Sequence, residues 1–290
     1  MPRLLAALAA CAVLLLAPLP APAAGAPIPI LAAENFYGDV AAQIGGPDVT
    51  VHSILTNPDE DPHLFEVSPS VGRNVAAARI VIYSGIDYDP WMQKLLQAVH
   101  APDRQIIVVA DLVGKHPGDN PHIWYDPATM PALAEHLAAA LSADAPAHRA
   151  MYEQRLEQFK TSLQPVLAKI AALRQRLAGT PVIATEPVFG YMFAALGMQV
   201  RDMPFQIAVM NNTEPGASEV AAFENDLRKH RVRLLVYNSQ ASDPIAVRMM
   251  RLAKASHIPV VGATETEPPG KTYQAWMLSE LDAVARALPP

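Results

Sequence analysis

Residues 145–177 read APAHRAMYEQRLEQFKTSLQPVLAKIAALRQRL. No strand-like run interrupts this stretch, and its apolar side chains recur every three or four positions, at Leu156, Phe159, Leu163, Leu167, Ile170 and Leu173. That spacing predicts one helix. At about 1.5 Å per residue the helix is about 50 Å long, and Pro165 is expected to kink it. Clean heptads are too few for a coiled coil. The helix is too long for a local crossover, so we interpret it as a spine that joins two lobes.

Short apolar runs alternate with helical patterns on both sides of this spine. The runs predicted as strands are 28–33, 49–55, 80–83, 106–110, 182–185, 234–237 and 258–261. Three capping residues before proline predict helix starts, at Ser68-Pro69, Asp126-Pro127 and Asp243-Pro244. Strand–helix alternation predicts the α/β class with parallel sheets. We therefore expect an N-terminal lobe over residues 24–144, a linking helix over 145–178 and a C-terminal lobe over 179–290.

The first residues have the pattern of an export signal. Arg3 precedes the apolar run Leu4 to Leu16, and Ala21-Pro22-Ala23 resembles a cleavage site. We expect residues 1–23 to be a signal peptide and the mature chain to be periplasmic. Cys11 is the only cysteine, and Leu8-Ala9-Ala10-Cys11 offers lipid anchoring as the weaker alternative. Cleavage after Ala23 leaves no thiol for a disulfide, a metal site or catalysis.

Composition and motifs exclude several other functions. The formal net charge is −6, and the sequence has no basic cluster, so nucleic acid is not an expected partner. The sequence contains no G-x-S-x-G, P-loop or H-E-x-x-H pattern. Serine hydrolysis, phosphate binding in a P-loop and zincin-type proteolysis therefore lack support.

Two histidines follow prolines in similar surroundings. Asp61-Pro62-His63 runs into Leu64-Phe65-Glu66, and Asn120-Pro121-His122 runs into Ile123-Trp124-Tyr125-Asp126. Proline stiffens the backbone before each imidazole. A stiff turn suits a preformed metal site, because less entropy is lost when the ion binds. We predict His63 and His122 as metal ligands, with Glu66 and Asp126 as candidates to orient the two rings.

Carboxylates follow two strands of the second lobe. Glu186 ends Ala184-Thr185-Glu186, and Glu265 ends Ala263-Thr264-Glu265. In open parallel sheets ligands bind beyond the carboxyl ends of the strands. Glu267 lies two residues further on, and the local sequence does not separate it from Glu265. Together with the histidines, these carboxylates predict a site of two imidazoles and two carboxylates between the lobes.

The same segments resemble a known family. Residues 34–39 (ENFYGD), 61–66 (DPHLFE), 120–124 (NPHIW) and 186–191 (EPVFGY) are similar to those of the cluster A-I substrate-binding proteins of metal ABC transporters. The resemblance covers essentially the whole mature chain. It implies two α/β lobes on a rigid helix and one Zn²⁺ or Mn²⁺ between them. It places the ligands at His63, His122, Glu186 and either Glu265 or Glu267, where the family usually has an aspartate.

The implied function is capture of one divalent cation per chain and its delivery to an ABC permease in the inner membrane. The chain is then a monomer and not an enzyme. Two imidazoles and two carboxylates suit both Zn²⁺ and Mn²⁺, and the histidine-rich loop common in zinc-binding members is absent. Two alternatives remain at this point. One is a siderophore- or cobalamin-binding protein, and the other is a metallohydrolase.

Overall fold

The computed structural model describes residues 26–58, 62, 65–241 and 243–290. The signal peptide predicted at 1–23, Cys11 and His63 lie outside the described residues. Within the described part of the chain, no helix combines the length and the apolar character that crossing a membrane requires.

The N-terminal lobe is built on a parallel sheet of four strands, in the order β2-β1-β3-β4. The strands are β1 (Ile28–Glu34), β2 (Val49–Leu55), β3 (Ile80–Tyr83) and β4 (Gln105–Val108). The helices are α1 (Asn35–Gly45), α2 (Pro69–Ala77), α3 (Pro90–Ala98), α4 (Val109–Leu112) and α5 (Thr129–Asp144), with 3-10 turns η1 (Gly46–Asp48) and η3 (Ile123–Tyr125). Buried β3 reads Ile-Val-Ile-Tyr, as expected of a strand covered on both faces.

The C-terminal lobe repeats this plan with strand order β6-β5-β7-β8, again parallel. The strands are β5 (Pro181–Ala184), β6 (Gln199–Val200), β7 (Leu235–Asn238) and β8 (Val260–Ala263). The helices are α8 (Gly190–Ala195), α9 (Met203–Met210), α10 (Ala217–Arg228), α11 (Pro244–Ala255) and α12 (Tyr273–Ala287), with the 3-10 turn η5 (Pro187–Phe189). The α/β prediction with two parallel-sheet lobes is confirmed.

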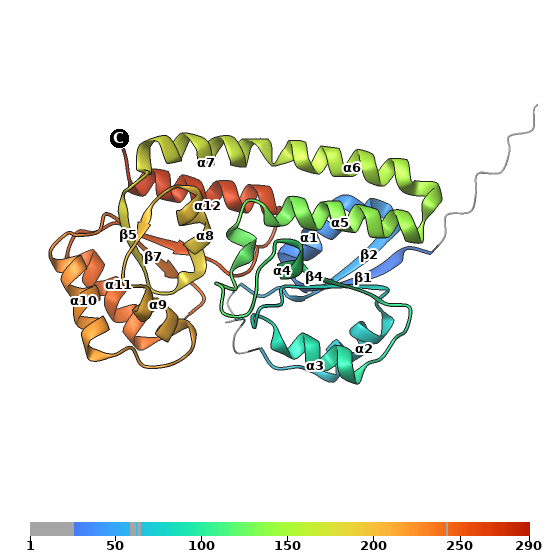
Figure 1. Ribbon diagram of the computed structural model, residues 1–290, viewed down its shortest axis with the longest axis horizontal. Coiled ribbons are helices and arrows are strands. Elements are labelled where there is room, and N and C mark those ends of the chain that lie inside the picture. The colour runs from blue at the N-terminus through green and yellow to red at the C-terminus, as the bar shows by residue number, and fades with distance from the viewer. Residues whose placement is uncertain (1–25, 59–61, 63–64, 242) are drawn as a thin grey trace, which may run out of the picture.

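The spine consists of two helices that run end to end along one side of the molecule (Figure 1). A 3-10 turn, η4 (Pro146–His148), precedes α6 (Arg149–Ser162), and α7 (Gln164–Leu177) follows. The break falls at Leu163, just before the expected kink, and Pro165 lies in the first turn of α7. Proline cannot donate to the preceding turn and its ring clashes with that turn, so the helix is interrupted before it. The C-terminal helix α12 packs against α7, and α5 packs against α6.

Helix starts agree with the prediction in two cases out of three. Helix α2 begins at Pro69 and α11 at Pro244, where the Asp243 carboxylate accepts hydrogen bonds from two backbone N–H groups of the first turn. The start at Asp126-Pro127 was wrong, because α5 begins at Thr129. Asp126 Oδ1 instead accepts from Ala128 N at 3.0 Å and closes a turn before the helix.

The largest hydrophobic core is shared by the two lobes and the spine. It joins β1 and β3 side chains to Phe159 and Leu173 of the spine, to Val236 of β7 and to Trp276 of α12. Because one apolar cluster crosses the lobe boundary, the lobes are held in a fixed relation.

Candidate metal centre

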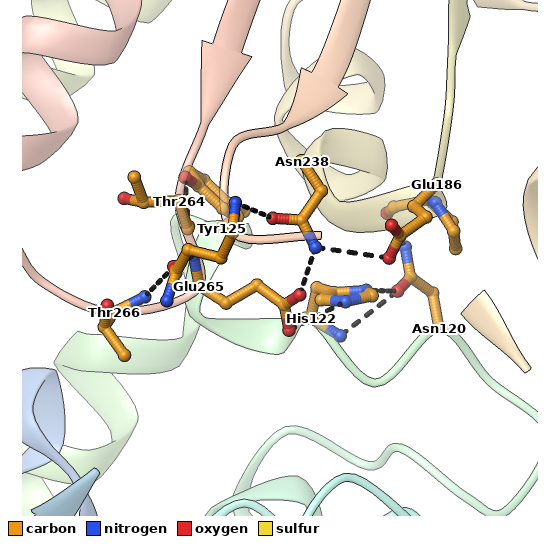
Figure 2. Close-up of polar contacts among 10 residues, drawn as sticks. Asn120, His122, Tyr125, Glu186, Asn238, Thr264, Glu265 and Thr266 are labelled. Atoms are coloured by element: carbon orange, nitrogen blue, oxygen red, sulfur yellow. Dashed lines mark hydrogen bonds and ion pairs between the residues drawn. The ribbon is translucent and has the colours of Figure 1, made fainter. Parts of the chain in front are cut away.

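Three neighbouring strands of the C-terminal sheet end in polar side chains at one place. Glu186 comes two residues after β5, Asn238 is the last residue of β7, and Glu265 comes two residues after β8. The strand order β5-β7-β8 brings the three together. His122 meets them from the loop before η3 in the other lobe (Figure 2). All four are buried, with 3% exposure or less.

The His122 ring and the Glu265 carboxylate are in direct proximity. His122 Nε2 lies 3.4 Å from Glu265 Oε2. The Asn238 side chain links this carboxylate to Glu186: its Nδ2 donates to Glu265 Oε1 at 2.5 Å and to Glu186 Oε2 at 3.2 Å. Of the predicted ligands, the structure thus places His122 directly beside Glu265 and links Glu186 to Glu265 through Asn238.

Asn120 orients the His122 ring. Its Oδ1 accepts from His122 Nδ1 at 2.7 Å and from His122 N at 3.1 Å, while its Nδ2 donates to Pro187 O at 2.6 Å. Since Oδ1 only accepts, Nδ1 is the ring nitrogen that donates to Asn120, and Nε2 is the nitrogen that faces Glu265. The expectation that Asp126 holds this ring was wrong. Asp126 Oδ1 accepts from Ala128 N, and Asp126 Oδ2 lies 3.6 Å from Lys115 Nζ.

The loop after β8 is held on both sides of Glu265. Gln240 Oε1 accepts from the backbone N–H of Glu265 at 2.5 Å and of Thr266 at 3.0 Å. From the other lobe, Tyr125 Oη donates to Thr264 O at 2.8 Å. The backbone on either side of Glu265 is therefore held by hydrogen bonds from both lobes.

Glu267 lies in a different environment from Glu265. Its backbone is paired with the Asn35 side chain, which accepts from Glu267 N at 2.9 Å and donates to Glu267 O at 2.7 Å. Burial, and then the charge of Asp39, raise the pKa of Glu267 to about 9. The charge of Asp39 thus acts on Glu267, whereas the Glu265 carboxylate faces His122.

The described side chains do not by themselves form a metal-binding cluster. Among the side chains that the structure describes, no three from His, Cys, Asp and Glu are grouped closely enough to hold a metal ion. Pro62, next to His63, is buried, and Glu66 is exposed. Because His63 lies outside the described residues, its part in the ligand set stays a prediction.

A buried acid pair lies near the centre and was missed from the sequence. Glu34, at the end of β1, is fully buried beside Asp89, whose oxygens accept from Ser84 N at 2.7 Å and Gly85 N at 2.9 Å. Burial, and then the charge of Asp89, raise the pKa of Glu34 well above its ordinary value, and burial raises that of Asp89 to about 6. Glu34 directly follows the predicted strand 28–33, so the strand-end rule that found Glu186 could also have found Glu34.

Tyr88 connects the pair to the centre. Its ring packs edge-on against His122 with centroids 6.0 Å apart. Burial raises its pKa well above the ordinary value, and the Glu265 charge adds to this. Tyr88 therefore provides a neutral wall to the site at physiological pH.

A cavity of about 450 Å³ opens between the lobes beside the centre. Its walls include Asp87 and Asn120 of one lobe and Pro187, Met203 and Ile207 of the other. Because Asn120 and Pro187 are close neighbours of His122 and Glu186 in the chain, the cavity lies next to the proposed ligands.

The chain matches the family model described as zinc-uptake complex component A, periplasmic, over residues 30–287. Among curated proteins it is similar to the metal ABC transporter substrate-binding lipoprotein SloC of Streptococcus mutans, with 25% identity over 285 residues and 89% of each chain covered. It is also similar to the manganese-binding lipoprotein MntA of Bacillus subtilis, with 21% identity over 280 residues and 89% of each chain covered.

Solved structures share the fold. The periplasmic zinc-binding protein TroA of Treponema pallidum superposes with a TM-score of 0.76 at 17% identity, over 92% of this chain and all of that one. A manganese-bound periplasmic metal-binding protein of Candidatus Liberibacter asiaticus gives 0.74 at 18% identity, over 89% of this chain and 98% of that one. The family model and the curated relatives fit the metal-transport interpretation and not the siderophore or cobalamin alternative.

Proposed function

The chain belongs to the family of the periplasmic component A of zinc-uptake complexes, and we propose that it binds one Zn²⁺ or Mn²⁺ ion between its lobes through His63, His122, Glu186 and Glu265. It is a substrate-binding component of a metal ABC transporter. The ion is its cargo, which it passes to a permease in the membrane. We further propose that it acts outside the cytoplasm as a soluble monomer.

One observation supports the ligand assignment above all others. His122 Nε2 and Glu265 Oε2 come from different lobes and lie 3.4 Å apart, both in side chains with no exposed surface. Burying a carboxylate is costly unless a positive partner or hydrogen bonds compensate. A bound cation, coordinated by the imidazole and the carboxylates, supplies that compensation.

The donor set accounts for the chemistry of capture. Zn²⁺ is commonly held by four imidazole nitrogens and carboxylate oxygens in a tetrahedron. Four protein ligands close the coordination sphere, so no position is left for a catalytic water. We therefore propose transport, and not metal-assisted hydrolysis, as the role of this site.

Calorimetric titration of the purified mature protein, stripped of metal, tests the proposal. Zn²⁺ and Mn²⁺ are added separately to wild type and to His122→Ala, with His136→Ala on helix α5 as the matched control. We expect one tight site per chain in wild type and in the control, and its loss in His122→Ala. No tight site for either ion in wild type would overturn the proposed function.

A further inference from the structure

Asn238 is placed between the two carboxylates that we propose as ligands (Figure 2). It ends the strand β7, which the sheet order puts between β5, the strand before Glu186, and β8, the strand before Glu265. Its Nδ2 lies 2.5 Å from Glu265 Oε1 and 3.2 Å from Glu186 Oε2. One amide nitrogen has two N–H donors, so it can serve one oxygen of each carboxylate.

The direction of the Asn238 amide is set by its surroundings. Its Oδ1 accepts from Gln240 N at 3.0 Å, and its own backbone N–H donates to Thr185 Oγ1 at 3.3 Å. The side chain is buried, with 2% exposure. With Oδ1 bound to a backbone N–H, the NH₂ group has to face the carboxylates. Asn238 is therefore a rigid donor and not an adaptable one.

This arrangement limits how each carboxylate can bind a metal. Asn238 engages Oε1 of Glu265, while Oε2 faces His122 Nε2 at 3.4 Å. It likewise engages Oε2 of Glu186. The bond from Asn238 uses one lone pair of one oxygen in each carboxylate and so weakens that oxygen as a metal donor, which favours coordination through the other oxygen. Two single oxygens with two imidazoles make four donors. Four donors suit Zn²⁺, whereas Mn²⁺ favours octahedral oxygen-rich sites and therefore gains more from carboxylates that bind through both oxygens.

We propose that Asn238 determines metal specificity by holding Glu186 and Glu265 to one-oxygen coordination, and so favours Zn²⁺ over Mn²⁺. The proposal rests on the proposed function, because it requires both glutamates to bind the same ion. Asn238 acts through the two ligands and is a positioning residue.

The test uses Asn238→Ser, since a single hydroxyl can donate to only one carboxylate. Asn238→Leu, which keeps the approximate shape and removes both donors, is measured beside it in case one variant does not fold. Asn225→Ser, an exposed asparagine on α10 of the same lobe, is the matched control. Zn²⁺ and Mn²⁺ affinities come from competition titrations, and X-ray absorption of the Zn²⁺- and Mn²⁺-loaded proteins gives the coordination number.

We expect the ratio of the Mn²⁺ to the Zn²⁺ dissociation constant to fall at least about tenfold in the Asn238 variants, which corresponds to about 1.4 kcal/mol. The Mn²⁺ coordination number should rise, and Asn225→Ser should match wild type in both measurements. Equal weakening of both ions, or an unchanged coordination number in folded variants, would overturn the specificity role and leave the proposed function standing. Failure of the proposed function is a separate result: wild type itself would bind neither ion tightly.

Discussion

Replacing Asn120 with alanine removes the hydrogen bond that orients His122. The side chain makes three hydrogen bonds in the structure, two to His122 and one across the lobe boundary to Pro187 O. At about 1 kcal/mol net for each bond, the free energy of unfolding should fall by about 3 kcal/mol. Loss of a group that orients a ligating imidazole weakens metal binding by about 10- to 100-fold, or about 1.4 to 2.7 kcal/mol. Both effects should appear together in Asn120→Ala.

Two further variants separate the effect of the ring orientation of His122 on metal binding from a general loss of structure around Asn120. Tyr191→Phe removes the donor to Asn120 O, at 2.8 Å, without touching the imidazole. Asn120→Asp keeps an acceptor for His122 Nδ1 and loses the donor to Pro187 O. Both should keep Zn²⁺ affinity within about threefold of wild type, whereas Asn120→Ala should not.

The assay is competition of the folded protein with a chromogenic chelator, after chemical unfolding has shown that each variant is native. If folded Asn120→Ala binds Zn²⁺ as tightly as wild type, Asn120 does not orient a ligand. The assignment of His122 Nε2 as the donor atom would then be refuted as well.

Three further predictions concern the carboxylates and protons. Glu265→Gln should weaken Zn²⁺ binding by more than about 100-fold, and Glu267→Gln should weaken it by less than about threefold. If calorimetry gives the reverse order, Glu267 is the ligand. Zn²⁺ affinity should fall as the pH is lowered from 7 to 5, because the imidazoles must give up protons to bind; an affinity independent of pH would exclude histidine ligands. Burial raises the pKa of Glu280 from 4.5 to about 7. The protonated carboxyl therefore stabilises the folded protein fully below pH 4.5, and the free energy of unfolding should fall by up to about 3 kcal/mol as the pH rises to 7. Glu280→Gln can still accept the hydrogen bond of Trp276 Nε1, at 3.1 Å, and should flatten this part of the stability–pH curve, as measured by urea unfolding.

The architecture could largely be predicted from the sequence, because buried parallel strands consist of short runs of apolar residues. Strands β1, β2 and β3 overlap the predicted ranges almost completely, while β4, β5, β7 and β8 are displaced by one or two residues. Strand β6 was missed, since two residues at a sheet edge carry no periodic signal. The position of the spine break was displaced to Leu163, because a proline acts on the turn before it.

The candidate site was accessible in part. The strand-end rule found Glu186 and Glu265, but it was applied only to acids and imidazoles and so passed over Asn238. Only the strand order shows that β7 lies between the other two strands. Glu265 and Glu267 could not be separated from local sequence, because the difference lies in distant partners: His122 for one, and Asp39 for the other.

The contacts between the lobes predict how the protein releases its ion. Among the described residues, seven hydrogen bonds cross the boundary near the site, from residues Asn35, Asp39, Asn120, Trp124 and Tyr125 of one lobe to Pro187, Tyr191, Thr264, Glu267 and Tyr273 of the other. At about 1 kcal/mol each, a rotation that broke them all would cost about 7 kcal/mol, before any loss from the shared core.

Movement of single side chains or loops breaks far fewer of these bonds, so we expect release by local motion and not by wide lobe rotation. Small-angle X-ray scattering of metal-loaded and metal-stripped protein should give superimposable curves, with amide hydrogen exchange differing only in the backbone around His122 and Glu265. A clear change in the radius of gyration on Zn²⁺ binding would show that the interlobe bonds do open, and that the shared core does not hold the lobes in place.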